Sequence, residues 1–116
     1  MKQFFTSFIY ALNGIRASVG EQRNLKVQAI IALIALGAGF YFEITMTEWC
    51  LVLFAIALVM GLEIVNSAIE SLVDLVTTEH KPLAGKVKDI AAGAVLFSAI
   101  IASIVGILIF GKYLYP

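Results

Sequence analysis

The stretch EIVNSAIESLVD, residues 63–74, places five polar residues in a segment that otherwise has the composition of a membrane span. Steps of three and four residues put Glu63, Asn66, Ser67, Glu70 and Asp74 on one face of a helix, where they meet the same neighbours. An ionisable side chain at the centre of a membrane helix costs about 2.5–3.5 kcal/mol on insertion scales, so such residues are rare there. Three carboxyl groups on one helix face therefore mark a candidate functional site.

The composition around this stretch predicts a membrane protein with a single domain. Of the 116 residues, 61% are hydrophobic and only 14% are charged, whereas soluble domains are about 25% charged. Eight basic and eight acidic residues cancel, so the charge gives no reason to expect a nucleic-acid partner. The single cysteine, Cys50, can form no intramolecular disulfide. Asn13 and Arg16 interrupt the first apolar run, so we expect no cleaved signal peptide.

Hydrophobic periodicity predicts an all-α fold with an N-terminal amphipathic surface helix and three transmembrane helices. The surface helix is expected at about residues 1–19, and the spans at about 25–42, 49–69 and 90–110. Each span approaches the roughly 20 helical residues that cross a hydrocarbon core of about 30 Å. The helical pattern of the second span continues to about Val76, so its last turns are expected to project into water.

Two polar connections separate the predicted spans. The first is expected at residues 43–48, and the second at residues 77–89, where Pro82 and Gly85 should prevent one continuous helix. In the third span, small residues recur every four positions and permit the close approach of another helix. This small-residue seam consists of Ala94, Ser98, Ala102 and Gly106.

Basic residues predict the orientation of the chain in the membrane. Lys2, Arg16, Arg23 and Lys26 precede the first span, and Lys81, Lys86 and Lys88 lie between the second and third. The connection at 43–48 has no basic residue. By the positive-inside rule, the N-terminus and the second connection are expected to be cytoplasmic. Glu63 should then lie within the cytoplasmic leaflet and Glu70 at the membrane surface.

The spacing of the carboxyl groups suggests two kinds of chemistry on one helix. Glu63 and Glu70 are separated by about 10.5 Å along the axis at 1.5 Å per residue. A buried carboxyl group at the depth of a lipid head group is a candidate general base. A carboxylate at the water's edge suits Mg²⁺, which takes few protein ligands. The chain has no Walker A pattern, no GxGxxG loop and no kinase catalytic-loop signature.

Spacing alone does not name the reaction, and three other interpretations stay open at this point. The polar face could join helices within a bundle without any chemistry. A small proton-coupled transporter could be built around Glu63. The chain could also be a structural or regulatory membrane subunit, although that would leave the carboxyl groups unexplained.

Two motifs, EIVNSAIESLVD and the downstream KPLAGKVKDIAAGAVL (residues 81–96), resemble the prokaryotic diacylglycerol kinase family, which includes the undecaprenol kinases. The resemblance covers nearly the whole chain. It implies a small integral-membrane homotrimer in the bacterial cytoplasmic (inner) membrane, with active sites between subunits at the cytoplasmic face. It also implies transfer of the γ-phosphate of ATP, with Mg²⁺, to a lipid hydroxyl. The acceptor would be undecaprenol or diacylglycerol, and the second motif looks slightly closer to the undecaprenol branch.

The resemblance also assigns roles to individual residues. Glu63 matches the catalytic base and Asn66 the asparagine beside it, while Glu70 matches a carboxylate that holds the metal. Glu21, within EQRNLKVQ, resembles a second metal carboxylate, and Arg16 is expected with Glu63 at the acceptor lipid. Residues that match the nucleotide site are Asp74, Lys88 and Asp89, with weaker contacts from Tyr10 and Glu79. The chain departs from the family at Glu79-His80-Lys81, where relatives often have an acid, a tyrosine and a histidine. The implied mechanism is in-line transfer without a covalent intermediate.

Overall fold

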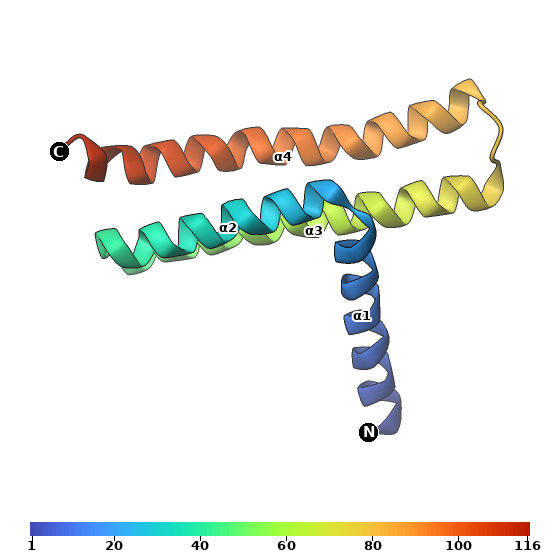
Figure 1. The fold of residues 1–116 in the computed structure, drawn as a ribbon, viewed down its shortest axis with the longest axis horizontal. Helices are drawn as coiled ribbons and strands as arrows, with labels where there is room; N and C mark the ends of the chain where they lie inside the picture. Colours follow the sequence, from blue (N-terminus) through green and yellow to red (C-terminus); the bar gives the residue numbers. More distant parts are fainter.

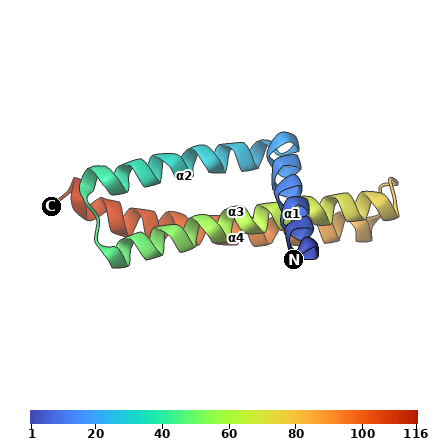
Figure 2. The same cartoon turned by 90° about the horizontal axis from the view of Figure 1, so that it is seen from below.

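The computed structural model describes all residues, 1–116, and consists of four α-helices. They are α1 (Lys2–Glu21), α2 (Arg23–Phe42), α3 (Met46–Val76) and α4 (Pro82–Leu114). Helices α2, α3 and α4 run side by side as a bundle, and α1 leaves this bundle at a steep angle (Figures 1 and 2). The segments Arg23–Tyr41, Met46–Val76 and Pro82–Leu114 are long and apolar enough to cross a membrane. The predicted all-α membrane fold, an N-terminal helix followed by three spans, is confirmed.

The bundle has two ends of different character. At one end α3 and α4 extend past the start of α2 and are joined by residues 77–81 (Figure 1). We call it the polar end and define it as residues 23–28, 63–76 and 82–89. The opposite end holds the connection between α2 and α3 and the C-terminus (Figure 1). We call it the closed end, residues 39–49 and 109–115.

Helix α3 begins earlier than its hydropathy predicts. Its first residue is Met46 rather than Trp49, because Thr45 and Glu48 form a capping box. The Thr45 Oγ1 accepts a hydrogen bond from the Glu48 backbone N–H at 3.2 Å, and Glu48 Oε1 accepts one from the Thr45 N–H at 2.9 Å. The predicted connection at 43–48 is therefore wrong in its second half. Glu48 belongs to the first turn of the helix.

Helix α4 also begins earlier than expected. Pro82 occupies the first turn of the helix, where a residue without an N–H group loses no hydrogen bond and its fixed φ suits a helix. The connection is therefore 77–81 rather than 77–89, and Gly85, expected to break the helix, lies inside it. The connection between the N-terminal helix and the first span is also shorter than the sequence predicts. Only Gln22, with an extended backbone, separates α1 from α2.

The interior of the bundle is unusually polar and its surface unusually apolar. Among the 12 buried residues are Glu48, Glu63, Asn66, Ser67 and Ser98. Most large apolar side chains of the spans face outward instead, as expected for helices surrounded by lipid. Helix association in such a protein depends on close packing and on polar contacts between helices rather than on apolar burial. The buried polar residues are therefore expected to contribute either to helix association or to function in each part of the bundle.

Candidate functional site

The predicted polar face of α3 is buried at its centre. Glu63 is 1% exposed, Asn66 5% and Ser67 7%. The Ser67 hydroxyl donates to the main-chain carbonyl of Glu63 at 3.1 Å, so its hydrogen-bonding capacity is used within its own helix. Glu63 and Asn66 are thus the buried side chains of this face that remain available to a ligand.

Asn66 joins the buried part of this face to its more exposed part. Its Nδ2 donates to Glu70 Oε1 at 3.2 Å, an i to i+4 contact that orients both side chains. Asn66 Oδ1 and Glu63 Oε1 are buried and have no hydrogen-bond partner. An unpaired buried polar atom costs about 1–3 kcal/mol, so native proteins rarely keep one without a use. Two unpaired acceptors side by side on one helix face indicate a place for a donor group or a cation.

Helix α2 contributes further polar side chains to this region. The Asn24 side chain lies near the Glu63 carboxyl group. Gln28 follows Asn24 by one helical turn on the same face, and its Oε1 is a further buried acceptor without a partner. The sequence gave no signal for Gln28 beyond its four-residue spacing from Asn24.

An ion pair lies where α3 and α4 leave the bundle. Lys88 Nζ donates to Asp74 Oδ1 at 2.8 Å, and the two side chains are 40% and 61% exposed. An exposed pair of this kind contributes about 0–1 kcal/mol to stability. Its main effect is to hold the Lys88 ammonium group next to the Asp74 carboxylate, near the end of α3. Glu79 pairs with Lys81 at 3.9 Å in the connection itself.

The remaining predicted residues are not gathered at this site within one chain. Tyr10, Arg16 and Glu21 lie on α1, where they are exposed, and α1 points away from the bundle (Figure 1). Asp89 is exposed, and none of these four side chains forms a hydrogen bond or an ion pair.

The metal site expected from Glu21 and Glu70 is not formed as a cluster in the single chain. No group of three or more His, Cys, Asp and Glu side chains could hold a metal ion. Mg²⁺ needs only one or two carboxylates when phosphate oxygens and water supply the other ligands. Glu70 fits this requirement, because it is half-buried and Asn66 occupies one of its two carboxylate oxygens.

A second buried carboxylate lies at the closed end, and the sequence did not reveal it. Glu48 is 6% exposed, its Oε1 accepts a hydrogen bond from the Tyr113 hydroxyl, and its Oε2 pairs with Lys112 Nζ. The Tyr113 ring stacks on Phe42 with centroids 5.6 Å apart. Glu48 therefore ties the start of α3 to the end of α4. The Thr45-x-x-Glu48 spacing could have shown the capping box, but not the partners on α4.

Comparisons with known proteins agree with the motifs of α3 and α4. A family model described as "Prokaryotic diacylglycerol kinase" matches residues 9–110. The chain is 42% identical over 110 residues to the undecaprenol kinase of Bacillus subtilis (strain 168), covering 95% of this chain and 89% of that protein.

Two relatives named diacylglycerol kinase are more distant. The one from Helicobacter pylori (strain J99) is 33% identical over 113 residues, which cover 97% of this chain and 85% of the relative. The one from Escherichia coli (strain K12) is 32% identical over 95 residues, which cover 82% and 78%. The family match at residues 9–110 includes most of α1, nearly all of the three candidate spans and both motifs. With its three apolar helices and its buried carboxylate face, the chain belongs to the prokaryotic diacylglycerol kinase family and is a membrane lipid kinase.

Proposed function

We propose that this protein transfers the γ-phosphate of ATP, in a Mg²⁺-dependent reaction, directly to the hydroxyl group of a membrane lipid, undecaprenol or diacylglycerol. The observation that carries the proposal is Glu63, a 1% exposed carboxylate with an unpaired oxygen. It lies on the same helix face as the more exposed Glu70 and Asp74. In this proposal the proton acceptor lies inside the membrane and the cation-binding groups lie outside it. The relative named undecaprenol kinase supports the same reaction class.

Glu63 is the general base in this proposal. It accepts the proton of the lipid hydroxyl while the hydroxyl oxygen attacks the γ-phosphorus. The bond from that phosphorus to the bridging oxygen breaks, ADP leaves, and no covalent enzyme intermediate forms. Asn66 lies one turn further along α3, where its free Oδ1 faces the same region and its Nδ2 holds Glu70. A base at this depth suits a substrate whose hydroxyl is held at the membrane interface by its own hydrocarbon chain.

The residues towards the water phase bind the nucleotide. Glu70 and Glu21 would hold Mg²⁺, which neutralises charge on the phosphates when it is bound with ATP. Lys88 is 40% exposed and already carries its ammonium group to the end of α3, so it supplies a positive contact for a phosphate. Further contacts to the nucleotide come from Asp74, Asp89, Glu79 and Tyr10, and Arg16 binds at the lipid head.

The proposal includes an assembly and an orientation. Tyr10, Arg16 and Glu21 are exposed on a helix without any buried residue, so a homotrimer would bring α1 of one subunit to the polar end of another. The polar end would face the cytoplasm, where ATP is present, and the N-terminus would lie on the same side of the bacterial inner membrane. Seven of the eight basic residues precede α3 or lie between residues 77 and 89, in agreement with the positive-inside rule.

The direct test is transfer of labelled γ-phosphate from ATP and Mg²⁺ to lipid in detergent micelles. Undecaprenol and diacylglycerol are supplied separately, and the Glu63→Gln variant serves as the control. Label in lipid from the wild type, but not from the variant, is the expected result, and the ratio of the two products identifies the acceptor. Folded wild-type protein that labels neither lipid would overturn the proposal, and proton flux in liposomes would then test transport.

A further inference from the structure

The aromatic side chains of the bundle gather at its closed end. Seven of the 13 aromatic residues of the chain lie there, within 39–49 and 109–115, and the polar end has none. Four of the other six belong to α1, and the last two, Phe54 and Phe97, lie within α3 and α4. The bundle therefore carries a cluster of aromatic residues at only one of its ends.

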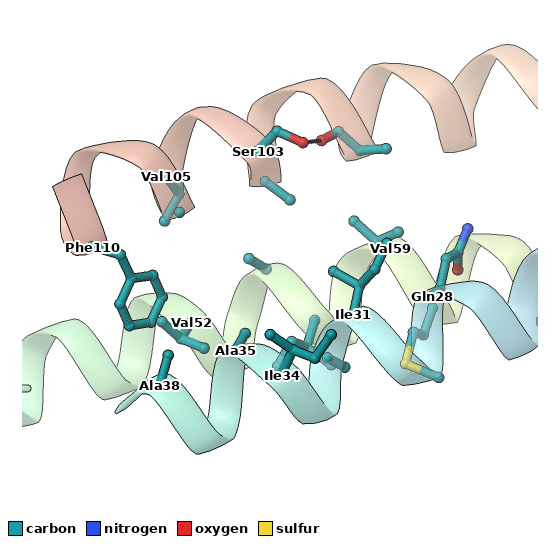
Figure 3. Close-up of a pocket in the computed structure, with 17 residues that line it drawn as sticks. Gln28, Ile31, Ile34, Ala35, Ala38, Val52, Val59, Ser103, Val105 and Phe110 are labelled. Carbon is teal, nitrogen blue, oxygen red and sulfur yellow. Dashed lines mark hydrogen bonds between the residues drawn. The ribbon is translucent and has the colours of Figure 1, made fainter. Parts of the chain in front are cut away.

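Four of these seven rings form an inner layer between the helices. They are half-buried and come from all three helices of the bundle: Phe42, Trp49, Phe110 and Tyr113. Phe42 and Tyr113 stack with ring centroids 5.6 Å apart, and Figure 3 shows Phe110 pointing from α4 toward α2 and α3. This inner layer gives the closed end an aromatic interior.

The other three rings project away from the bundle. Phe40 is 75% exposed, Tyr41 80% and Tyr115 87%. Phe40 packs on Trp49 and Tyr41 on Phe42, each pair with ring centroids 4.9 Å apart. Two of the outer rings are therefore held by the inner layer without being buried. We call Phe40, Tyr41, Tyr115 and Trp49 the aromatic collar.

The polar atoms of the aromatic collar have no partner within the protein. The Tyr113 hydroxyl donates to Glu48. The hydroxyl groups of Tyr41 and Tyr115 and the indole N–H of Trp49, in contrast, form no hydrogen bond within the chain. A ring that is apolar on its body and polar at its tip suits the boundary between lipid and water, and tyrosine and tryptophan are enriched there. The aromatic collar thus has the composition of a surface that binds this boundary.

We propose that the aromatic collar binds the lipid–water interface on the side of the closed end and anchors the bundle there. The partner is the head-group region of the bilayer, which meets the free polar tips while the rings lie against the upper acyl chains. The polar end, without aromatic residues, has no such anchor, so the closed end sets the depth of α3 in the membrane. The inference does not depend on the kinase function.

The spacing along α3 supports an anchor at this level. Glu70 follows Trp49 by 21 residues on one continuous helix, a distance of about 32 Å at 1.5 Å per residue. This length matches the hydrocarbon thickness of about 30 Å. Glu63 is 14 residues from Trp49, or about 21 Å. An interface at Trp49 therefore puts Glu70 at the opposite boundary of the hydrocarbon core and Glu63 inside it.

The fluorescence of Trp49, the single tryptophan of the chain, measures the depth of the aromatic collar. The full chain is placed in phosphatidylcholine vesicles whose acyl chains carry bromine, a quencher, either near the head group or near the methyl end. Bromine near the head group should quench Trp49 more strongly, and stronger quenching by the deep bromine would overturn the proposal. The depth reference is Phe97→Trp combined with Trp49→Phe. Phe97 is 70% exposed within α4, and this variant should show the opposite preference.

Tyr41→Leu combined with Tyr115→Leu tests the anchoring itself. Both side chains are exposed and form no hydrogen bond, so the variant removes two polar tips and leaves the packing of the bundle intact. The ratio of shallow to deep quenching of Trp49 should fall in this double variant. Phe97→Leu, which removes an outward ring at a different level, is the matched control and should keep the wild-type ratio. An unchanged ratio in the double variant would show that other residues set the depth, and the anchor would be overturned.

Discussion

The two ends of the bundle each bury a carboxylate on α3, but they treat it in opposite ways. At the closed end, Glu48 accepts hydrogen bonds from the Thr45 N–H and the Tyr113 hydroxyl and pairs with Lys112. At the polar end, Glu63 is even less exposed, yet its Oε1 has no partner. A buried carboxylate surrounded by donors contributes to structure, because its oxygens are occupied. A buried carboxylate with a free oxygen, such as Glu63, has the arrangement that the proposed general base requires.

The neighbours of these carboxylates differ in the same sense. Around Glu48 the chain is tightly packed, and Phe42 lies between Phe110 and Tyr113 with ring centroids 6.3 Å and 5.6 Å away. The polar end, in contrast, also holds Asn66 Oδ1 and Gln28 Oε1, two further buried acceptors without a partner. The closed end fixes the relative positions of three helices, which leaves the polar end free to bind ligands without holding the bundle together.

The largest expected difference between the two ends appears when each carboxylate is made an amide. Glu63→Gln should lower lipid phosphorylation by about 10²–10⁴-fold, the usual contribution of a general base, while nucleotide binding stays largely intact. Glu48→Gln should keep most of the activity but lower the unfolding temperature in detergent by several degrees, because the pair with Lys112 is lost. Phosphate transfer, nucleotide binding and thermal unfolding are measured for both. Substantial activity in Glu63→Gln would remove Glu63 as the base.

The next effect concerns the carboxylate at the water's edge. Glu70→Ala should abolish Mg²⁺-dependent nucleotide binding, because it removes a metal ligand and the partner of Asn66. Glu43→Ala, at the closed end, is the control and should bind nucleotide normally. Binding of a fluorescent ATP analogue with and without Mg²⁺ measures both variants. Unchanged Mg²⁺-dependent binding in Glu70→Ala would place the metal elsewhere.

A smaller effect is expected from the packing of the closed end. A Cβ on Gly39 would lie 2.7 Å from Trp49 Cη2 and 3.2 Å from Ile44 Cδ1, and the Trp49 ring is also held by Phe40, with centroids 4.9 Å apart. Gly39→Ala should therefore destabilise the protein by roughly 1–3 kcal/mol. Gly37→Ala, with open space around its Cβ, should not destabilise it. Thermal unfolding of the two variants in one detergent decides the point, and equal stabilities would show that the Trp49 contact is easily relaxed.

The smallest effect should come from the turn after α2. Glu43 has φ 52° and ψ 54°, a left-handed conformation that favours glycine. Glu43→Gly should raise stability by a few tenths to about 1 kcal/mol, since a Cβ is strained in this region. The activity of this variant should equal that of the wild type. A loss of stability in the same unfolding measurement would mean that the Glu43 side chain makes a favourable contact that outweighs the strain.

The sequence predicted the fold well because hydropathy and helical periodicity act locally. The predicted starts of α3 and α4 were wrong, because a few polar residues there form helix caps rather than connections. Thr45 and Glu48 look like loop residues on a hydropathy scale, but their side chains satisfy the first N–H groups of α3. Pro82 was expected to lie within a connection, yet it starts a helix because its ring suits the first turn.

The site was predictable on α3 but not across helices. Glu63, Asn66 and Glu70 share a face by spacing alone, and the structure confirms that shared face. Gln28 depends on which face of α2 meets α3, and neither helix encodes that choice by itself. Tyr113, one of the partners of Glu48, lies 65 residues further along the chain, so no local sequence pattern relates the two residues. Roles that depend on α1, such as those of Tyr10 and Glu21, stay predictions.

The length of α3 has a further consequence. Its 31 residues, at 1.5 Å each, give a rod of about 46 Å, longer than the hydrocarbon thickness of about 30 Å. One continuous helix therefore carries both Glu63, the proposed proton acceptor, and Glu70, the proposed metal ligand, at a fixed separation. The depth of the lipid hydroxyl, in contrast, is set by the bilayer and not by the helix. If the proposed function holds, activity should depend on membrane thickness, because a thicker or thinner bilayer shifts the lipid hydroxyl relative to these fixed side chains.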